Sequence, residues 1–104
     1  MAYRIIYHPK AQAELDKIYA DIVPEAGYRV AGDFVDGILD FIDALATFPE
    51  RGTIRESRIS GLRIIGYQRS VSIAFSIKGE NVLILGVFAR GREINDDILE
   101  DRTS

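Results

Sequence analysis

Arginine is the residue type that carries most of the possible chemistry in this sequence of 104 residues. Residues 51–92 hold eight basic and two acidic side chains, and seven of the eight bases are arginine. Guanidinium groups make bidentate contacts with carboxylate or phosphate, so these side chains are suited to binding. Three partners remain open: the protein's own acids, an acidic protein and an RNA backbone. The candidate binding residues are Arg51, Arg55, Arg58, Arg63, Arg69, Arg90 and Arg92.

Position along the chain separates structural from functional candidates among these arginines. Arg63 falls inside a predicted strand, which favours an ion pair with one of the protein's own carboxylates. Arg90 and Arg92 follow the last predicted strand, in a turn that contains Gly91. We therefore expect Arg90 and Arg92 to meet a partner.

Other side chains that could do chemistry have simpler interpretations. His8 could act as a general base, because histidine titrates near neutral pH, but a surface histidine at a strand end is more common. Tyr67 could stack on a nucleotide base, but a half-buried sheet tyrosine is the ordinary case. Four aspartates repeat at helical spacing, which is typical of a solvated helix face rather than of an acid/base or cation site. They are Asp33, Asp36, Asp40 and Asp43.

The sequence lacks the groups that most cofactor and metal sites need. Cysteine is absent, which excludes disulfides, thiol nucleophiles and thiolate metal sites. A single histidine argues against a histidine-based zinc site. No phosphate-binding glycine loop and no Gly-x-Ser-x-Gly turn occurs. We expect no cofactor and no metal.

The net charge of −3 hides an uneven distribution of charge along the chain. Residues 1–50 carry four bases and nine acids, and residues 93–104 carry one base and five acids, so the arginine-rich stretch lies between two acidic segments. The acidic total argues against indiscriminate nucleic-acid binding, and we expect no direct DNA binding by this chain alone. It leaves room for a local basic face toward an acidic partner.

Length and composition predict one globular domain over residues 1–104. Hydrophobic residues make up 47% and charged residues 28%, which excludes a disordered chain. No apolar run approaches the roughly 20 residues that span a bilayer. The first ten residues lack the apolar stretch of a secretory signal, so the expected location is the cytoplasm.

The elements that position these side chains follow from hydrophobic periodicity. The pattern predicts a β-α-α-β-β-β order with a possible final helix, an α+β fold in which an αα-hairpin packs on a small, mainly antiparallel sheet. Pro24 ends the first predicted helix, Pro49 ends the second, and Gly79 supplies a positive φ in a hairpin turn. The predicted strands are 3–7, 62–67, 71–77 and 82–88, the helices lie on either side of 24–27, residues 50–61 form a loop, and 93–100 form the final helix.

Two further predictions concern the helices and the sheet face. The second helix presents a stripe made of Val30, Phe34, Ile38, Phe41, Leu45 and Phe48. The strand at 71–77 alternates apolar residues with small ones, which predicts a half-exposed antiparallel strand. Its small-residue face is solvated or closely covered by another chain, and it consists of Ser70, Ser72, Ala74 and Ser76.

The ordered motifs resemble the ParE/RelE superfamily of bacterial toxins from type II toxin–antitoxin modules, and the ParE branch most of all. The resemblance spans residues 3–100. Each motif alone is weak, and the specificity comes from the ordered set, which includes the Phe-Pro-x-x-Gly ending of the second helix. The motifs that carry it are Tyr7-His8-Pro9-Lys10-Ala11, Leu45-Ala46-Thr47-Phe48-Pro49-Glu50-Arg51-Gly52, Gly61-Leu62-Arg63 and Val82-Leu83-Ile84-Leu85-Gly86-Val87-Phe88-Ala89-Arg90-Gly91-Arg92-Glu93.

The resemblance implies a toxin that is neutralised by a cognate antitoxin, whose acidic, partly disordered segment wraps the toxin. ParE-like members inhibit DNA gyrase, whereas RelE-like members cleave mRNA on the ribosome. Cleavage needs an acid and a base, and arginine is a poor proton donor. Ala89 stands where many relatives carry His or Tyr, so we favour a non-enzymatic gyrase inhibitor, with the RelE-like endonuclease as the alternative. A third hypothesis is a member that only binds its antitoxin.

The resemblance also gives two candidate antitoxin surfaces beside the arginines. One is the small-residue sheet face, and the other is the groove of the αα-hairpin. The residues do not choose between them.

Overall fold

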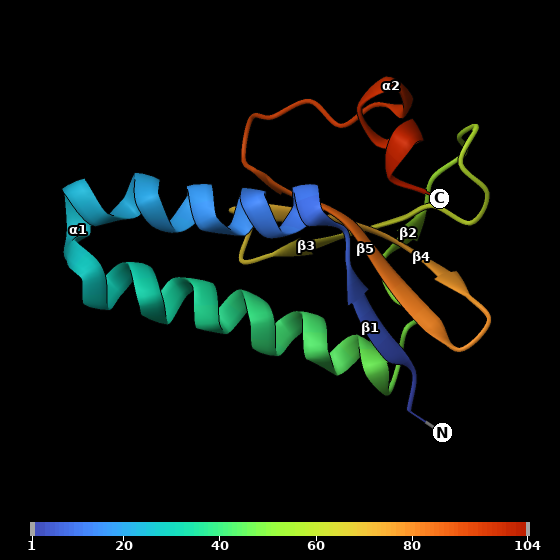
Figure 1. Cartoon of the computed structure of the whole chain (residues 1–104), viewed down its shortest axis with the longest axis horizontal. Helices are drawn as coiled ribbons and strands as arrows, with labels where there is room; N and C mark the ends of the chain where they lie inside the picture. The colour runs from blue at the N-terminus through green and yellow to red at the C-terminus, as the bar shows by residue number, and fades with distance from the viewer. Residues whose placement is uncertain (1, 104) are drawn as a thin grey trace.

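A computed structural model describes residues 2–103 of the chain as an α+β fold, as predicted (Figure 1). No helix within 2–103 is both long and apolar enough to cross a membrane. The elements are β1 (Arg4–Tyr7), α1 (Pro9–Asp43), the 3₁₀ turn η1 (Ala44–Ala46), β2 (Thr53–Ile54), β3 (Arg63–Tyr67), β4 (Val71–Lys78), β5 (Asn81–Ala89), α2 (Asp96–Leu99) and the 3₁₀ turn η2 (Glu100–Arg102).

The predicted αα-hairpin is present, because α1 folds back on itself at Gly27. Gly27 has φ 91° and ψ 168°, outside the helical region, and the arms on either side of it run antiparallel (Figure 1). The prediction that Pro24 ends the first helix is wrong, since Pro24 lies inside α1. Proline removes one helical hydrogen bond but keeps a helical φ, whereas only glycine adopts φ near +90° at low cost.

The second arm also ends earlier than Pro49. It becomes a 3₁₀ turn at Ala44, so Phe48 lies outside the helix and is 70% exposed. At the other end of the predicted stripe, Val30 is 51% exposed. The middle of the stripe is buried as expected, with Ile38 and Leu45 fully inaccessible. A stripe residue is therefore buried only if it also lies in the middle of the stripe, where the chain packs on the sheet. Pointing to the correct side of the helix is not sufficient.

The strands form one five-stranded mixed sheet in the order β1-β5-β4-β3-β2. β1 pairs with β5 in parallel, and the other pairs are antiparallel. β5 is an inner strand, as its uniformly apolar sequence predicted, and Gly79 has the expected positive φ of 61°. The prediction of a plain loop over 50–61 is wrong at β2, because two residues forming an edge ladder leave no periodic pattern in a sequence.

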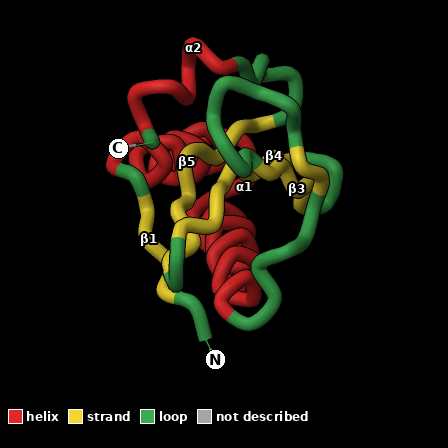
Figure 2. The backbone as a smooth tube through the Cα atoms, turned by 90° about the vertical axis from the view of Figure 1, so that its right-hand side faces the viewer, coloured by secondary structure: helices red, strands yellow, loops and turns green. Residues whose placement is uncertain are grey.

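Both faces of the sheet are covered, at least in part. The arms of α1 pack on one face around Ile38, Phe75 and Ile84, and Figure 2 looks nearly along the arms with the strands in front of them. The chain's own C-terminal segment packs on the other face, where Leu99 and Leu85 meet Ala74. The prediction of a half-exposed β4 is therefore wrong at its centre, and the cover comes from the same chain.

Candidate functional site: the arginine groups

The seven candidate arginines do not form one surface. They lie in three places: against the C-terminal segment, beside the second arm of α1, and at one end of the sheet. The first group is Arg55 and Arg58, the second is Arg51 and Arg63, and the third is Arg69, Arg90 and Arg92.

Arg58 holds the C-terminal segment through three acids, an arrangement called here the C-terminal clamp. Its Nη2 donates to Asp97 Oδ1 at 2.7 Å, and its Nε and Nη2 lie 3.5 Å from Asp96 Oδ2 and Glu100 Oε2. The Arg58 backbone N–H also donates to Asp96 and is the main reason that the pKa of Asp96 lies below its ordinary value. Arg55 Nη1 adds a hydrogen bond of 3.1 Å to the carbonyl of Ile94. These arginines therefore contact the protein's own acidic tail.

Arg51 and Arg63 support the loop that follows the second arm. The Arg51 guanidinium lies 5.7 Å from the ring centre of Phe41, within the range of a cation–π contact. Arg63 Nη1 donates to the Arg51 carbonyl at 3.3 Å. The ion pair predicted for Arg63 is absent among residues 2–103, where its side chain contacts this carbonyl instead.

Arg69, Arg90 and Arg92, called here the sheet-end arginines, make no ion pair or side-chain hydrogen bond with residues 2–103. Arg69 lies in the turn from β3 to β4, and the Arg90 backbone N–H donates to the carbonyl of the adjacent Ser70 at 2.8 Å. Arg92 lines a shallow hollow with acidic and basic residues of the first α1 arm, Glu14, Lys17 and Asp21. These three residues remain available to a partner.

The turn that carries Arg69 is conformationally strained. Gln68 and Arg69 have φ values of 50° and 57°, a left-handed conformation that non-glycine residues rarely adopt. The Ser70 N–H closes the turn on the Tyr67 carbonyl at 3.0 Å. Strained residues of this kind are found more often at functional sites than elsewhere, which makes this end of the sheet the best binding candidate.

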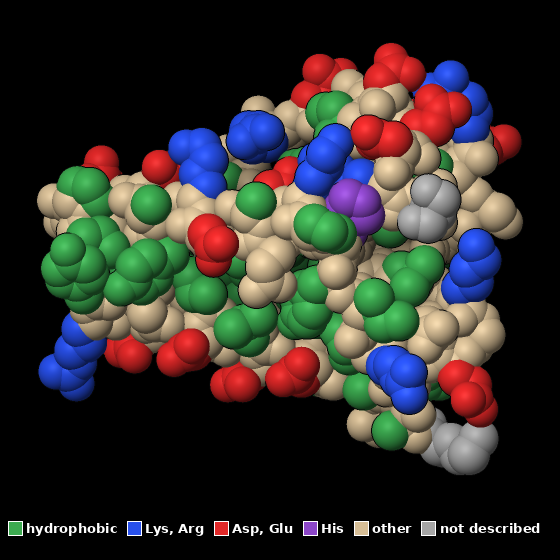
Figure 3. Space-filling model, in the orientation of Figure 1, with side chains coloured by type: hydrophobic (Ala, Val, Ile, Leu, Met, Phe, Trp, Pro, Cys, Tyr) green, Lys and Arg blue, Asp and Glu red, His purple; other side chains and the backbone are tan. Residues whose placement is uncertain are grey.

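The other residues weighed for chemistry have structural roles. His8 caps the N-terminus of α1, with Nδ1 accepting from the Lys10 N–H at 3.0 Å. Tyr67 is half-buried, and its ring lies 5.9 and 5.2 Å from the rings of Phe34 and Phe41. Acidic side chains line the outer edge of the second arm (Figure 3). Asp33, Asp36, Asp40 and Asp43 are all exposed there, and no group of three metal-ligating side chains occurs within residues 2–103.

Sequence reasoning missed a buried ion pair between Arg102 and Glu14. Arg102 Nη1 lies 2.9 Å from Glu14 Oε1 and 3.0 Å from the Leu85 carbonyl, and the guanidinium covers the Phe88 ring at 5.6 Å. Glu14 Oε1 also accepts from the Val87 N–H at 3.1 Å. The available signal was that Arg102 is the single base in an acidic tail.

Comparisons with known proteins identify the family of this chain. Residues 5–94 match the family described as the ParE toxin of the type II toxin–antitoxin system, parDE. A search of curated protein sequences finds no significant match.

Solved structures agree with this fold. The chromosomal ParDE toxin–antitoxin system from P. aeruginosa aligns with a TM-score of 0.74 and 28% identity, over 85% of this chain and 96% of that one. The E. coli toxin RelE, as a double arginine-to-alanine mutant in the free state, aligns with a TM-score of 0.67 and 13% identity over 100% of both chains, a likeness of fold alone. The family match covers most of the chain, and the chain belongs to the ParE toxin family of type II toxin–antitoxin systems.

Proposed function

We propose that this ParE-like toxin binds DNA gyrase and inhibits it without cutting nucleic acid. Membership of the ParE toxin family is the observation that carries the proposal. It makes the chain the toxin of a two-protein module whose partner is a cognate antitoxin. Gyrase inhibition, and through it arrest of bacterial growth, is the activity proposed for the toxin when it is free of that partner.

The roles of the titratable side chains support a non-enzymatic mechanism. General acid–base cleavage of RNA needs groups that exchange protons near neutral pH. His8 uses Nδ1 to cap α1, and Tyr67 is packed between Phe34 and Phe41. Both side chains therefore already have structural contacts, and arginine does not release its proton at this pH.

We also propose that the sheet-end arginines bind an acidic surface of the antitoxin or of the target. Their support is that Arg69, Arg90 and Arg92 are exposed and make no ion pair among residues 2–103. Arg51, Arg55, Arg58 and Arg63 were also candidates on sequence grounds, with Arg63 favoured for a structural ion pair. They become weaker candidates because their side chains already contact the protein itself. Exposed charges steer association, so their effect should depend on salt.

The direct test measures gyrase and translation in parallel with the purified toxin. In the purified assays we expect gyrase to lose its supercoiling activity and linear DNA to accumulate, while translation continues. In cells that express the toxin without its antitoxin we expect an SOS response. Unaffected supercoiling at saturating toxin together with arrested translation would overturn the proposal. The double variant Arg90→Glu/Arg92→Glu then shows whether the sheet-end arginines serve gyrase, the antitoxin or both.

A RelE-like ribosome-dependent mRNA endonuclease is the second candidate. The observation that favours it is the set of sheet-end arginines, which could bind RNA phosphate. Primer extension on translated mRNA would show cuts at fixed codon positions if this candidate were correct. If the wild-type chain is not toxic in a cell and affects neither gyrase nor mRNA, the remaining hypothesis is a member that only binds its antitoxin.

A further inference from the structure

The αα-hairpin is longer than the sheet that it covers. Figure 1 shows both arms of α1 extending past the end of the sheet at which β3 turns into β4 and β5 ends. The sheet-end arginines lie at that end, where Arg92 lines a hollow with Lys17 and Asp21 of the first arm. Residues 16–36 make up the outer half of the hairpin and are called here the hairpin tip. Figure 3 shows the resulting outline, narrow at the hairpin tip and broad over the sheet.

The hairpin tip is acidic. Residues 16–36 hold five acids and two bases. One of these acids, Asp21, is paired with Lys17 at 3.1 Å. The other four are exposed and make no ion pair with residues 2–103; they are Asp16, Glu25, Asp33 and Asp36. The tip therefore presents negative charge that its own chain leaves without a cation, and this charge attracts a basic surface.

The hairpin tip also exposes large apolar side chains. Tyr28 is 73% exposed and Val30 is 51% exposed. The ring of Tyr28 lies 6.5 Å from the ring of Tyr19 on the other arm. Hydrophobic side chains gather at this end of the molecule in Figure 3. An apolar group that includes aromatic rings and is bordered by charge is typical of a surface that contacts another protein.

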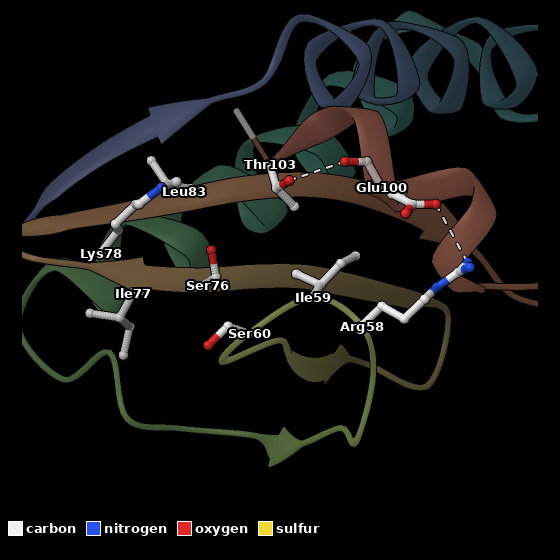
Figure 4. A pocket seen from close by; sticks show the side chains of 9 residues that line it. All are labelled: Arg58, Ile59, Ser60, Ser76, Ile77, Lys78, Leu83, Glu100 and Thr103. Atoms are coloured by element: carbon white, nitrogen blue, oxygen red, sulfur yellow. Dashed lines mark hydrogen bonds and ion pairs between the residues drawn. The ribbon is translucent and has the colours of Figure 1, made fainter.

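The sheet end of the same chain carries the opposite charge. Other arginines of the basic stretch already contact the protein itself; Arg58, for example, meets Glu100 of the C-terminal segment (Figure 4). The hairpin tip leaves Arg69 and Arg90 without ion pairs, because both arms run outward beyond the end of the sheet (Figure 1). A second copy of the chain, approaching from outside, brings its own acidic tip to these arginines.

We propose that two copies of the free toxin associate about a twofold axis, with the hairpin tip of each copy against the sheet-end arginines of the other. Each contact then occurs twice, because a twofold interface is self-complementary. Asp33 and Asp36 would meet the arginines, and Tyr28 would lie against the guanidinium of Arg69, which binds an aromatic ring as well as a carboxylate. The proposal goes beyond the proposed function, because it concerns the toxin without antitoxin or gyrase.

Such a dimer covers the residues proposed to bind an acidic partner. A sheet-end arginine cannot meet a second toxin and another partner at once, so self-association competes with binding through these residues. The dimer would be a stored form of the free toxin, and the monomer the form that exposes the arginines. Its charged groups are exposed in the monomer, so the association should be weak and sensitive to salt.

The first test is sedimentation velocity of the purified full chain. As the protein concentration is raised in about 50 mM salt, the average mass should approach that of two chains. Raising the salt to about 500 mM should return it to the mass of one chain, because the contacts between exposed charges are then screened. A monomer at every concentration in low salt would overturn the proposal.

The second test uses two charge reversals to identify the interface. Asp33→Lys/Asp36→Lys and Arg90→Glu/Arg92→Glu should each be monomeric where the wild type is dimeric, because like charges then face each other in both contacts. Mixed in equal amounts, the two variants should form a heterodimer, since both contacts then join opposite charges. A dimer that survives either reversal, or two monomeric variants that stay monomeric when mixed, would overturn the proposal.

The matched control is Asp40→Lys/Asp43→Lys, which reverses two exposed acids of the same arm away from the hairpin tip. It should dimerise like the wild type and form no heterodimer with the arginine variant.

Tyr28→Ser tests the apolar part of the interface. It should raise the dissociation constant of the dimer by roughly tenfold, because tyrosine is often a dominant contact residue. Ile54→Ser, at an exposed apolar residue of β2, should leave the constant unchanged. An unchanged constant for Tyr28→Ser would remove the hairpin tip from the interface and overturn the proposal. None of these measurements contains gyrase or antitoxin, so their failure would leave the proposed function intact.

Discussion

Arg102 donates to Glu14 across 2.9 Å, and this pair completes the edge of β5 where β1 no longer covers it. β1 ends at Tyr7, opposite Ile84, and β5 bulges at the next residue, Leu85. The Leu85 carbonyl and the Val87 N–H would then lack strand partners. Arg102 satisfies the carbonyl and Glu14 the N–H, so two side chains 88 residues apart replace a missing strand.

Removing Glu14 should therefore destabilise the protein strongly. Glu14→Ala leaves a guanidinium that is 8% exposed without its counter-charge and frees the Val87 N–H. We expect the free energy of unfolding to fall by about 3–5 kcal/mol, as for other broken buried pairs. Urea denaturation measures it, with Glu25→Ala, an exposed acid of the same arm, as the control. A loss below about 1 kcal/mol would show that the pair contributes no more than an exposed one.

The C-terminal clamp should govern local opening rather than global stability. Arg58 and its acids are largely exposed, and exposed pairs contribute little to the free energy of unfolding. Arg58→Gln should leave the unfolding midpoint almost unchanged but speed amide hydrogen exchange in α2 several-fold. Arg29→Gln provides the matched control. Equal exchange rates in α2 for all three proteins would mean that apolar contacts of Leu99 alone hold the segment.

The same clamp should respond to acid. The pKa of Asp96 lies below its ordinary 3.8, chiefly because the Arg58 N–H donates to the carboxylate. The resulting stabilisation is fully present above pH 3.8 and is lost as the pH falls through the lowered folded-state pKa. NMR titration of the carboxyl carbons should show Asp96 protonating below 3.8. Arg58→Gln should raise its pKa only in part, because the backbone donor remains, and titration at 3.8 or above in the wild type would contradict the assignment.

Periodic and local features of this fold could be predicted from the sequence. The αα-hairpin, the strands β3 to β5 and the positive φ of Gly79 each depend on residues close together in the chain. The break in the helix was placed at Pro24 instead of Gly27, because its position depends on which residue can adopt a positive φ at low energetic cost. The two-residue β2 was missed because it exists only through its pairing with β3. Local pattern does not contain that information.

The candidate site was harder to predict because contacts between distant segments decide it. Arg58 lies in a predicted loop with no acidic partner evident from the sequence, yet two of its three acidic partners lie 38 and 39 residues away on the C-terminal segment. The burial of Arg102 depends on a bulge at Leu85, and no sequence motif predicts that bulge. Charge counting predicted a basic block, and only the fold shows that Arg69, Arg90 and Arg92 remain unpaired among residues 2–103.

A substitution in the strained turn at the end of the sheet should change the stability of the fold and the affinity for a partner in opposite directions. Arg69 has φ 57°, so Arg69→Gly relieves a left-handed conformation and should stabilise the fold by about 1 kcal/mol. The same change removes a sheet-end arginine and should weaken binding to the antitoxin or gyrase. Gly79→Ala, at φ 61° in the other hairpin, is the opposite control and should destabilise. Weaker binding without a gain in stability would mean that the turn is not strained.

Gly37 and Tyr67 should be energetically coupled across the interface between α1 and the sheet. Tyr67 reaches the second arm between Phe34 and Phe41, and a Cβ added at Gly37 would collide with the Tyr67 hydroxyl. Gly37→Ala should therefore destabilise the protein, although alanine is favoured over glycine in a helix by about 1 kcal/mol. In a Tyr67→Phe background the collision with the hydroxyl is gone, so the same substitution should become neutral or stabilising.

A double-mutant cycle of four proteins in urea measures this coupling, which we expect to be about 1–2 kcal/mol. Gly32→Ala is the matched control on the same arm, because nothing lies within 4 Å of a Cβ built there. It should stabilise the protein by a similar amount in both backgrounds. Equal effects of Gly37→Ala with and without the Tyr67 hydroxyl would show that the ring moves aside at no cost, and that glycine at position 37 is not required for close packing of the second arm on β3.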